Sequence, residues 1–88
     1  MRVVVLDGAR FTDKVSAHEY IAEILGFPEY YGKNLDALDD SLHELARDTG
    51  VVIVNAAAAK RALSDYADGL FEDFLDVLGG RFRVCIFE

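Results

Sequence analysis

The sequence predicts an α/β fold in which a small three-stranded parallel sheet packs with about four helices. Three short runs of apolar, mostly β-branched residues indicate the strands: Val3–Leu6, Val51–Val54 and Phe82–Phe87. Segments with helical spacing separate these runs, and a helix is the usual connection between neighbouring parallel strands. The first two runs do not alternate between apolar and polar residues, so we expect both of these strands to be buried on both faces.

Apolar spacing and helix-end signals predict helices over approximately residues 16–25, 34–47, 56–63 and 66–78. We expect Ser16 to cap the first helix, because Glu19 follows three residues later and completes a capping box. Asn34 and Asn55 are candidate caps for the second and third helices. Glycine commonly ends a helix, and the expected stops are Gly26 and the pair Gly79-Gly80.

Size and charge narrow the classes of function. The 88 residues suffice for a single small domain over residues 1–88, and 52% of them are hydrophobic. The single cysteine, Cys85, lies in an apolar run, so we expect a buried, unreactive thiol and no internal disulfide.

A net charge of −7 argues against nucleic-acid binding, which requires neutralising phosphates. No segment has the length of a membrane span or a signal peptide, so we expect a cytoplasmic protein.

The predicted second helix carries a concentration of acids opposite its apolar stripe. The stripe consists of Leu35, Leu38, Leu42 and Leu45, and the other face carries Asp36, Asp39, Asp40 and His43. Carboxylates three or four residues apart repel each other by a few tenths of a kcal/mol, roughly. The helix dipole favours a first-turn acid by about 0.3–1 kcal/mol, which explains Asp36 but not Asp39 or Asp40. This pattern favours a binding surface, and an ordinary solvated acidic face is the alternative.

The turn before this helix places two aromatic residues, Tyr30 and Tyr31, side by side between Pro28 and Gly32. Neighbouring loop residues rarely both point inward, so we expect one tyrosine to be exposed beside the acids. An exposed aromatic residue next to a charged patch is typical of a protein interface. The alternative is that both rings cover the edge of the core.

These residues resemble a known family signature. The run Pro28-Glu29-Tyr30-Tyr31-Gly32-Lys33-Asn34-Leu35-Asp36-Ala37-Leu38-Asp39-Asp40-Ser41-Leu42 is similar to that of the barstar family, in which a PEYYG-type turn leads into an NLDALWD-type helix. A weaker likeness extends over the whole chain in order and spacing. The resemblance implies the barstar-like fold, a three-stranded parallel sheet packed with helices, which agrees with the pattern described above.

The resemblance also implies an activity. Members of this family are intracellular inhibitors of small, basic, secreted microbial ribonucleases of the guanyl-specific, barnase-like type, and they protect the RNA of the producing cell. The inhibitor inserts the loop and second helix into the active site of the ribonuclease, where its carboxylates occupy the sites of RNA phosphates. By this resemblance we expect a monomer that forms a 1:1 complex with its ribonuclease and needs no cofactor or metal.

The family's interface residues carry over position by position. Asp40 matches the dominant acid, Asp36 a second acid, and Tyr30 the aromatic residue that packs on the catalytic histidine of the ribonuclease. Asp76 is the better match for an acid on the fourth helix, and Asp73 is the weaker candidate. The family usually has Trp where this chain has Asp39. The expected partner-binding residues are Tyr30, Gly32, Asn34, Leu35, Asp36, Asp39, Asp40, His43 and Asp76.

Three other interpretations have weaker support. His18 and His43 could pair with aspartates in an enzyme, but His18 lies among apolar neighbours and fits a structural role better. Asp36, Asp40 and His43 could approach a metal, but one helix face offers too few convergent ligands. A barstar-like module that binds a partner other than a ribonuclease, as an immunity protein for another toxin would, is the remaining alternative.

Overall fold

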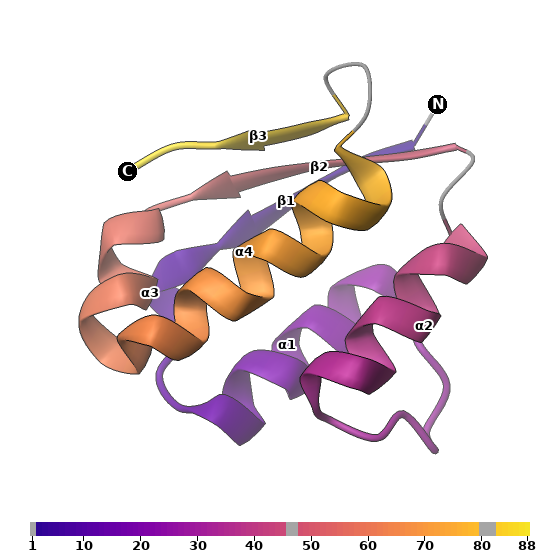
Figure 1. The fold of residues 1–88 in the computed structure, drawn as a ribbon, viewed down its shortest axis with the longest axis horizontal. Helices are drawn as coiled ribbons and strands as arrows, with labels where there is room; N and C mark the ends of the chain where they lie inside the picture. The colour runs from indigo at the N-terminus through magenta and orange to yellow at the C-terminus, as the bar shows by residue number, and fades with distance from the viewer. Residues whose placement is uncertain (1, 46–47, 80–82) are drawn as a thin grey trace.

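The computed structural model describes residues 2–45, 48–79 and 83–88. The described elements, in chain order, are β1 (Arg2–Asp7), the short 3-10 helix η1 (Gly8–Arg10), α1 (Lys14–Leu25), α2 (Leu35–Leu45), β2 (Thr49–Val54), α3 (Ala56–Leu63), α4 (Asp65–Leu78) and β3 (Val84–Ile86). The strands form one parallel sheet in the order β1-β2-β3 (Figure 1). The predicted α/β fold, with a three-stranded parallel sheet and four helices, is therefore confirmed.

The two faces of the sheet differ. Figure 1 shows α1, α2 and α4 on one side of the strands. On β1, Leu6 points to that side and is completely buried, whereas Val3 and Val5 are 57% and 56% exposed. The prediction that β1 is buried on both faces is wrong, because the helices cover only one face. The central strand β2 is more enclosed, although its Val52 and Val54 are only half-buried.

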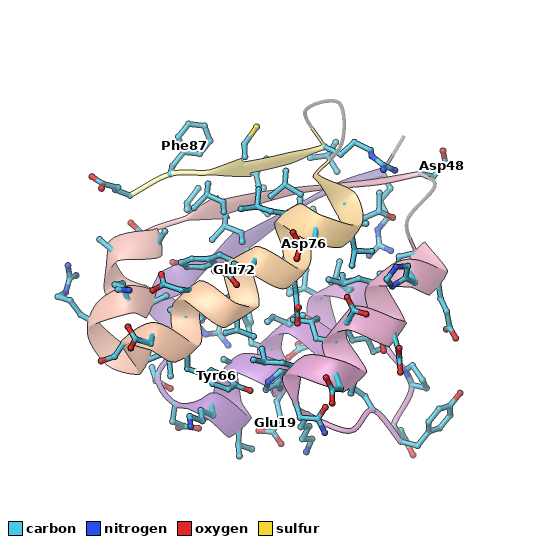
Figure 2. The ribbon with its side chains drawn as sticks, viewed as in Figure 1. Glu19, Asp48, Tyr66, Glu72, Asp76 and Phe87 are labelled. Atoms are coloured by element: carbon cyan, nitrogen blue, oxygen red, sulfur yellow. The ribbon has the colours of Figure 1, made fainter. Side chains whose placement is uncertain are left out.

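The face of the sheet that none of the described helices covers, here called the open face, also shows that the prediction for the Cys85 thiol is wrong. Cys85 pairs in register with Val52 and is exposed, not buried. Phe87, just after β3, is 58% exposed, and Figure 2 shows it on the side of the sheet away from α4. An apolar run thus indicated a strand correctly but not whether both of its faces were covered.

The start of α1 differs from the prediction. Asp13 is the cap: its carboxylate accepts hydrogen bonds from the Ser16 backbone N–H at 2.8 Å and from the Ser16 hydroxyl at 2.9 Å. Ser16 therefore lies inside the helix, because the earlier carboxylate satisfies the free amide first. Gly26 ends α1 in the left-handed conformation with φ 76°, as predicted.

Of the two other predicted helix caps, Asn34 is confirmed and Asn55 is wrong. Asn34 caps α2, since its side-chain oxygen accepts a hydrogen bond from the Ala37 N–H at 2.7 Å. Asn55 makes no capping hydrogen bond; its backbone is left-handed with φ 54°, and its side-chain amide donates to Asp7 Oδ1 at 2.9 Å. The expected end of the second helix at Arg47, the glycine at position 80 and the start of the third strand at Phe82 lie outside the described residues.

The packing of α2 against α4 and the core fixes the direction of its acidic face. Leu38 and Leu42 are completely buried, as the leucine stripe predicts. Gly69 of α4 lies close to Leu35, because a Cβ atom built on Gly69 would come within 3.0 Å of Leu35 Cδ1. With its leucine stripe against α4 and the core, α2 turns Asp36 and Asp40 outward.

Candidate partner-binding surface

The segment between α1 and α2, residues 26–34, is here called the α1–α2 loop. Its two tyrosines point in opposite directions: Tyr30 is 89% exposed and Tyr31 is only 7% exposed. A turn forms between them and Pro28, whose carbonyl accepts a hydrogen bond from the Tyr31 N–H at 3.0 Å. The expectation that one of the two tyrosines is exposed is confirmed, and Tyr31 is the one that faces the core.

Tyr31 is held by both its ring and its hydroxyl group. Its ring lies against that of Phe27, with centroids 5.0 Å apart. Its hydroxyl lies 2.7 Å from Nδ1 of His18, which is completely buried in α1. The other ring nitrogen of His18 lies 2.7 Å from the hydroxyl of Tyr66 on α4. Burial lowers the pKa of His18, so the ring is neutral at pH 7. The structural role expected for this histidine is confirmed.

The second half of the loop packs tightly onto the start of α2. A Cβ atom on Gly32 would lie 3.2 Å from the Ala37 side chain, so glycine allows the close approach. Besides capping α2, Asn34 donates a hydrogen bond to the Gly32 carbonyl at 3.3 Å. Lys33 adopts a left-handed backbone with φ 55° and forms an ion pair with Glu19 of α1 at 3.0 Å. These contacts order the loop next to the first turn of α2.

The acids of α2 differ in exposure. Asp36 and Asp40 are exposed, and Asp39 is half-buried. Among the residues that the structure describes, neither Asp36 nor Asp40 forms an ion pair. His43 lies beside Asp39, with Nδ1 2.8 Å from the Asp39 carbonyl oxygen and 3.6 Å from its carboxylate. Asp36 and Asp40 therefore present carboxylates that are available to a partner.

A shallow hollow lies between the α1–α2 loop and α2, with a volume of about 230 Å³. Tyr30 and Asp40, which were predicted from separate segments, both line it. The lining residues are Pro28, Tyr30, Tyr31, Gly32, Ala37, Asp40, Ser41 and Glu44. Its lining combines aromatic and aliphatic groups with the carboxylates of Asp40 and Glu44, which suits a cationic or imidazole side chain. Glu44 was not predicted as part of the site; its position four residues after Asp40 is the signal that could have found it.

Helix α4 extends the acidic surface. Figure 2 shows Glu72 and Asp76 on this helix, and both side chains are exposed. Asp76 is thus accessible, as its predicted role requires. Leu35, by contrast, is half-buried against Gly69 in the free protein, so any contact it makes with a partner would involve only its exposed part.

Asp73 is the unusual acid of this surface. Its Oδ2 atom is buried and has no hydrogen-bond partner among the described residues. Burial raises the pKa of Asp73 to about 6, with further contributions from the charges of Asp39, Asp76, Asp36 and Glu72. The sequence contained a signal for this position, because Asp73 lies three residues after the buried Leu70 and so belongs near the apolar stripe.

Two structural features relate to membrane and metal binding. In the described ranges, no helix is long and apolar enough to cross a membrane. Likewise, no group of three or more His, Cys, Asp or Glu side chains in the described part of the chain could hold a metal ion.

Comparison with known proteins agrees with the fold and with the loop-and-helix signature. The model of a family described as "Barstar (barnase inhibitor)" matches residues 1–84, which include the α1–α2 loop, α2 and α4. A Bacillus subtilis (strain 168) protein named "Putative ribonuclease inhibitor YrdF" is 36% identical over 73 residues, or 82% of this chain and 80% of that protein. With the three-stranded parallel sheet and the family match over nearly its whole length, the chain belongs to the barstar family.

Proposed function

We propose that this protein inhibits a small, basic, secreted microbial ribonuclease of the guanyl-specific, barnase-like type by covering its active site. The single observation that carries the proposal is the hollow lined by exposed Tyr30 together with Asp40, on the rim of an acidic surface. The family described as a barnase inhibitor and the name of the Bacillus relative support the choice of a ribonuclease. The protein would act as a monomer in a 1:1 complex.

The physical basis is charge complementarity on a preorganised surface. A ribonuclease active site concentrates cationic groups that stabilise a charged transition state. Asp36 and Asp40 would meet these groups with charge-assisted hydrogen bonds, in place of RNA phosphates. Because the carboxylates lie on one rigid helix, binding orders few side chains and costs little conformational entropy. Tyr30 would supply apolar contact area beside the charges.

The remaining predicted residues have supporting roles in this proposal. Gly32 and Asn34 would offer backbone and packing contacts along the loop, and Leu35 would contribute its exposed edge. Asp39 and His43 would contact the rim of the ribonuclease, and Asp76 would add a contact from α4. The inhibitor would need no catalytic residue, metal or cofactor, would bind neither nucleic acid nor membrane, and would act in the cytoplasm.

The test is titration of the protein into a guanyl-specific microbial ribonuclease during RNA cleavage. We expect stoichiometric inhibition by the wild-type protein and a loss of at least about thirtyfold in affinity for Asp40→Ala, since removing a buried charge partner at an interface costs about 2–5 kcal/mol. The matched control is Glu23→Ala, which removes an exposed carboxylate from α1 and changes the net charge equally. This control should inhibit like the wild type.

Two outcomes would contradict the proposal. Equal inhibition by Asp40→Ala and the wild type would remove Asp40 from the interface. If the wild-type protein, correctly folded, inhibited none of several such ribonucleases at micromolar concentration, the function would shift to another protein partner of the same acidic surface.

A further inference from the structure

A chain of three polar side chains crosses the interior behind the α1–α2 loop. Tyr31 of the loop, His18 of α1 and Tyr66 of α4 follow one another through two hydrogen bonds, both 2.7 Å long. The rings also contact edge to face or at a tilt, with His18 centroids 5.7 Å from Tyr31 and 5.9 Å from Tyr66. One histidine therefore joins three separate elements of the fold.

The two ring nitrogens of His18 have different roles in these hydrogen bonds. A neutral imidazole has one N–H donor and one lone pair, so one tyrosine donates its O–H to His18 and the other accepts the His18 N–H. Both ring nitrogens are then satisfied, which matters because His18 is completely buried. Removing either hydroxyl group leaves a ring nitrogen without its partner.

The fixed position of Tyr31 bears on the direction of its neighbour Tyr30. Tyr31 directly follows Tyr30, so a fixed inward Tyr31 side chain limits the backbone positions open to Tyr30. The beginning of the loop is tied to α1 by the Phe27 N–H, which donates to the Ala22 carbonyl at 2.9 Å, and its end is tied to α2 by Asn34. Between these ends, the described contact that joins the loop to the buried interior is the Tyr31 side chain.

We propose that His18 and Tyr66 are positioning residues of the binding surface, which act through Tyr31 to hold the α1–α2 loop with Tyr30 outward beside Asp40. His18 is completely buried, and the Tyr31 hydroxyl lies against it, so neither group can touch a partner directly, although Tyr31 also lines the hollow. Their effect on a partner is preorganisation: the fraction of molecules with a binding-competent loop multiplies the affinity. The effect on inhibition rests on the function proposed above, whereas the effect on the loop does not.

The first measurement follows the loop itself and needs no partner. The chain has no tryptophan, so Tyr30→Trp creates a single fluorescent reporter on the loop. In this background we compare Tyr31→Phe and Tyr66→Phe, each of which removes one hydroxyl of the chain. The matched control is Tyr20→Phe, which removes the hydroxyl that accepts the Asp7 N–H at 2.8 Å on another part of α1. Time-resolved anisotropy should report greater local motion in the first two variants and no change in the control.

The second measurement uses the same three Tyr→Phe changes, without the reporter, in ribonuclease inhibition below the unfolding transition of every variant. Tyr31→Phe should weaken inhibition by about three- to tenfold, the range expected when one buried hydrogen bond no longer holds the loop. Tyr66→Phe should weaken it less, because it acts through His18. Tyr20→Phe should inhibit like the wild type despite a similar loss of stability.

The outcomes separate the two proposals. Unchanged loop motion in Tyr31→Phe and Tyr66→Phe, or an equal change in Tyr20→Phe, would overturn the positioning role. If Tyr31→Phe fails to fold, Tyr66→Phe alone decides between these results. If the wild type inhibits no ribonuclease, the proposed function fails, and the anisotropy of the loop still decides whether His18 holds it.

Discussion

Among the residues that the structure describes, none donates a hydrogen bond to the buried Oδ2 atom of the Asp73 carboxyl group. Burial and four neighbouring acids raise its pKa from 3.8 to about 6. Because the folded state binds this proton more tightly than the unfolded state does, the charged form opposes folding. The destabilisation is absent below pH 3.8, grows as the pH rises towards about 6, and stays constant above that value.

We therefore expect Asp73→Asn to be more stable than the wild type at pH 7, by an amount on the order of 1 kcal/mol after allowing for solvent screening of a partly exposed group. The advantage should shrink as the pH falls from 6 to 4. Urea unfolding of both proteins across this pH range measures the difference, with Glu23→Gln of α1 as a control. A stability difference independent of pH would show that the Asp73 carboxyl titrates normally.

Individual residues of the candidate site differ in how well the sequence predicts them. The pattern indicated that one of two adjacent tyrosines would be exposed, but only the packing of Phe27 and His18 selects Tyr31 as the buried one. The acids of α2 were identified because their spacing is costly for an isolated helix. Glu44 was missed as a functional candidate and Asp73 was named only as the weaker acid of the fourth helix, since their surroundings are created where the loop meets α2 and where α2 meets α4.

At the scale of elements, the start of a helix depends on the backbone as well as on the residue type. Asn34 and Asn55 both precede helices, and the sequence predicts the same capping role for them. Asn34 fulfils it, whereas Asn55 has a left-handed backbone and binds the Asp7 side chain instead. The helix bounds at Ala56–Leu63 were nevertheless predicted correctly, because apolar spacing sets the extent of a helix independently of its cap.

The two asparagines should consequently respond differently to one substitution. Serine caps helices well, so Asn34→Ser should change the free energy of unfolding by less than about 0.5 kcal/mol. Serine tolerates the left-handed region poorly and is too short to replace the amide bond to Asp7, so Asn55→Ser should cost about 1–2 kcal/mol. Denaturant unfolding compares them, and Asn55→Gly serves as the control that restores left-handed freedom. Equal losses at both positions would contradict this distinction.

At the scale of the whole molecule, the net charge of −7 should steer association with a basic ribonuclease. Raising the ionic strength from about 0.01 M to about 0.15 M shortens the Debye length from about 30 Å to about 8 Å. We expect association to slow by about tenfold over this range, while dissociation changes far less. Stopped-flow kinetics measures both rates, and an association rate independent of salt would rule out electrostatic steering.

The sequence of elements and the parallel three-stranded sheet could be predicted, because three apolar runs separated by helical spacing leave few arrangements of a small sheet. Which faces of the sheet the helices cover could not be predicted. A continuous apolar run fits either a strand buried on both faces or an edge strand such as β1, with Val3 and Val5 exposed. That difference depends on where the helices pack, which no single segment encodes.

The open face of the sheet gives the molecule two sides with separate uses. Cys85 is exposed and is in register with Val52 and, through it, with the exposed Val5, so it lies on the face of the sheet opposite the helices that carry the acidic surface. It is the sole cysteine of the chain, so a thiol-reactive dye, spin label or solid support would attach at one defined point. A protein immobilised through this atom would turn its loop and acids towards the solution, ready for a ribonuclease to be captured.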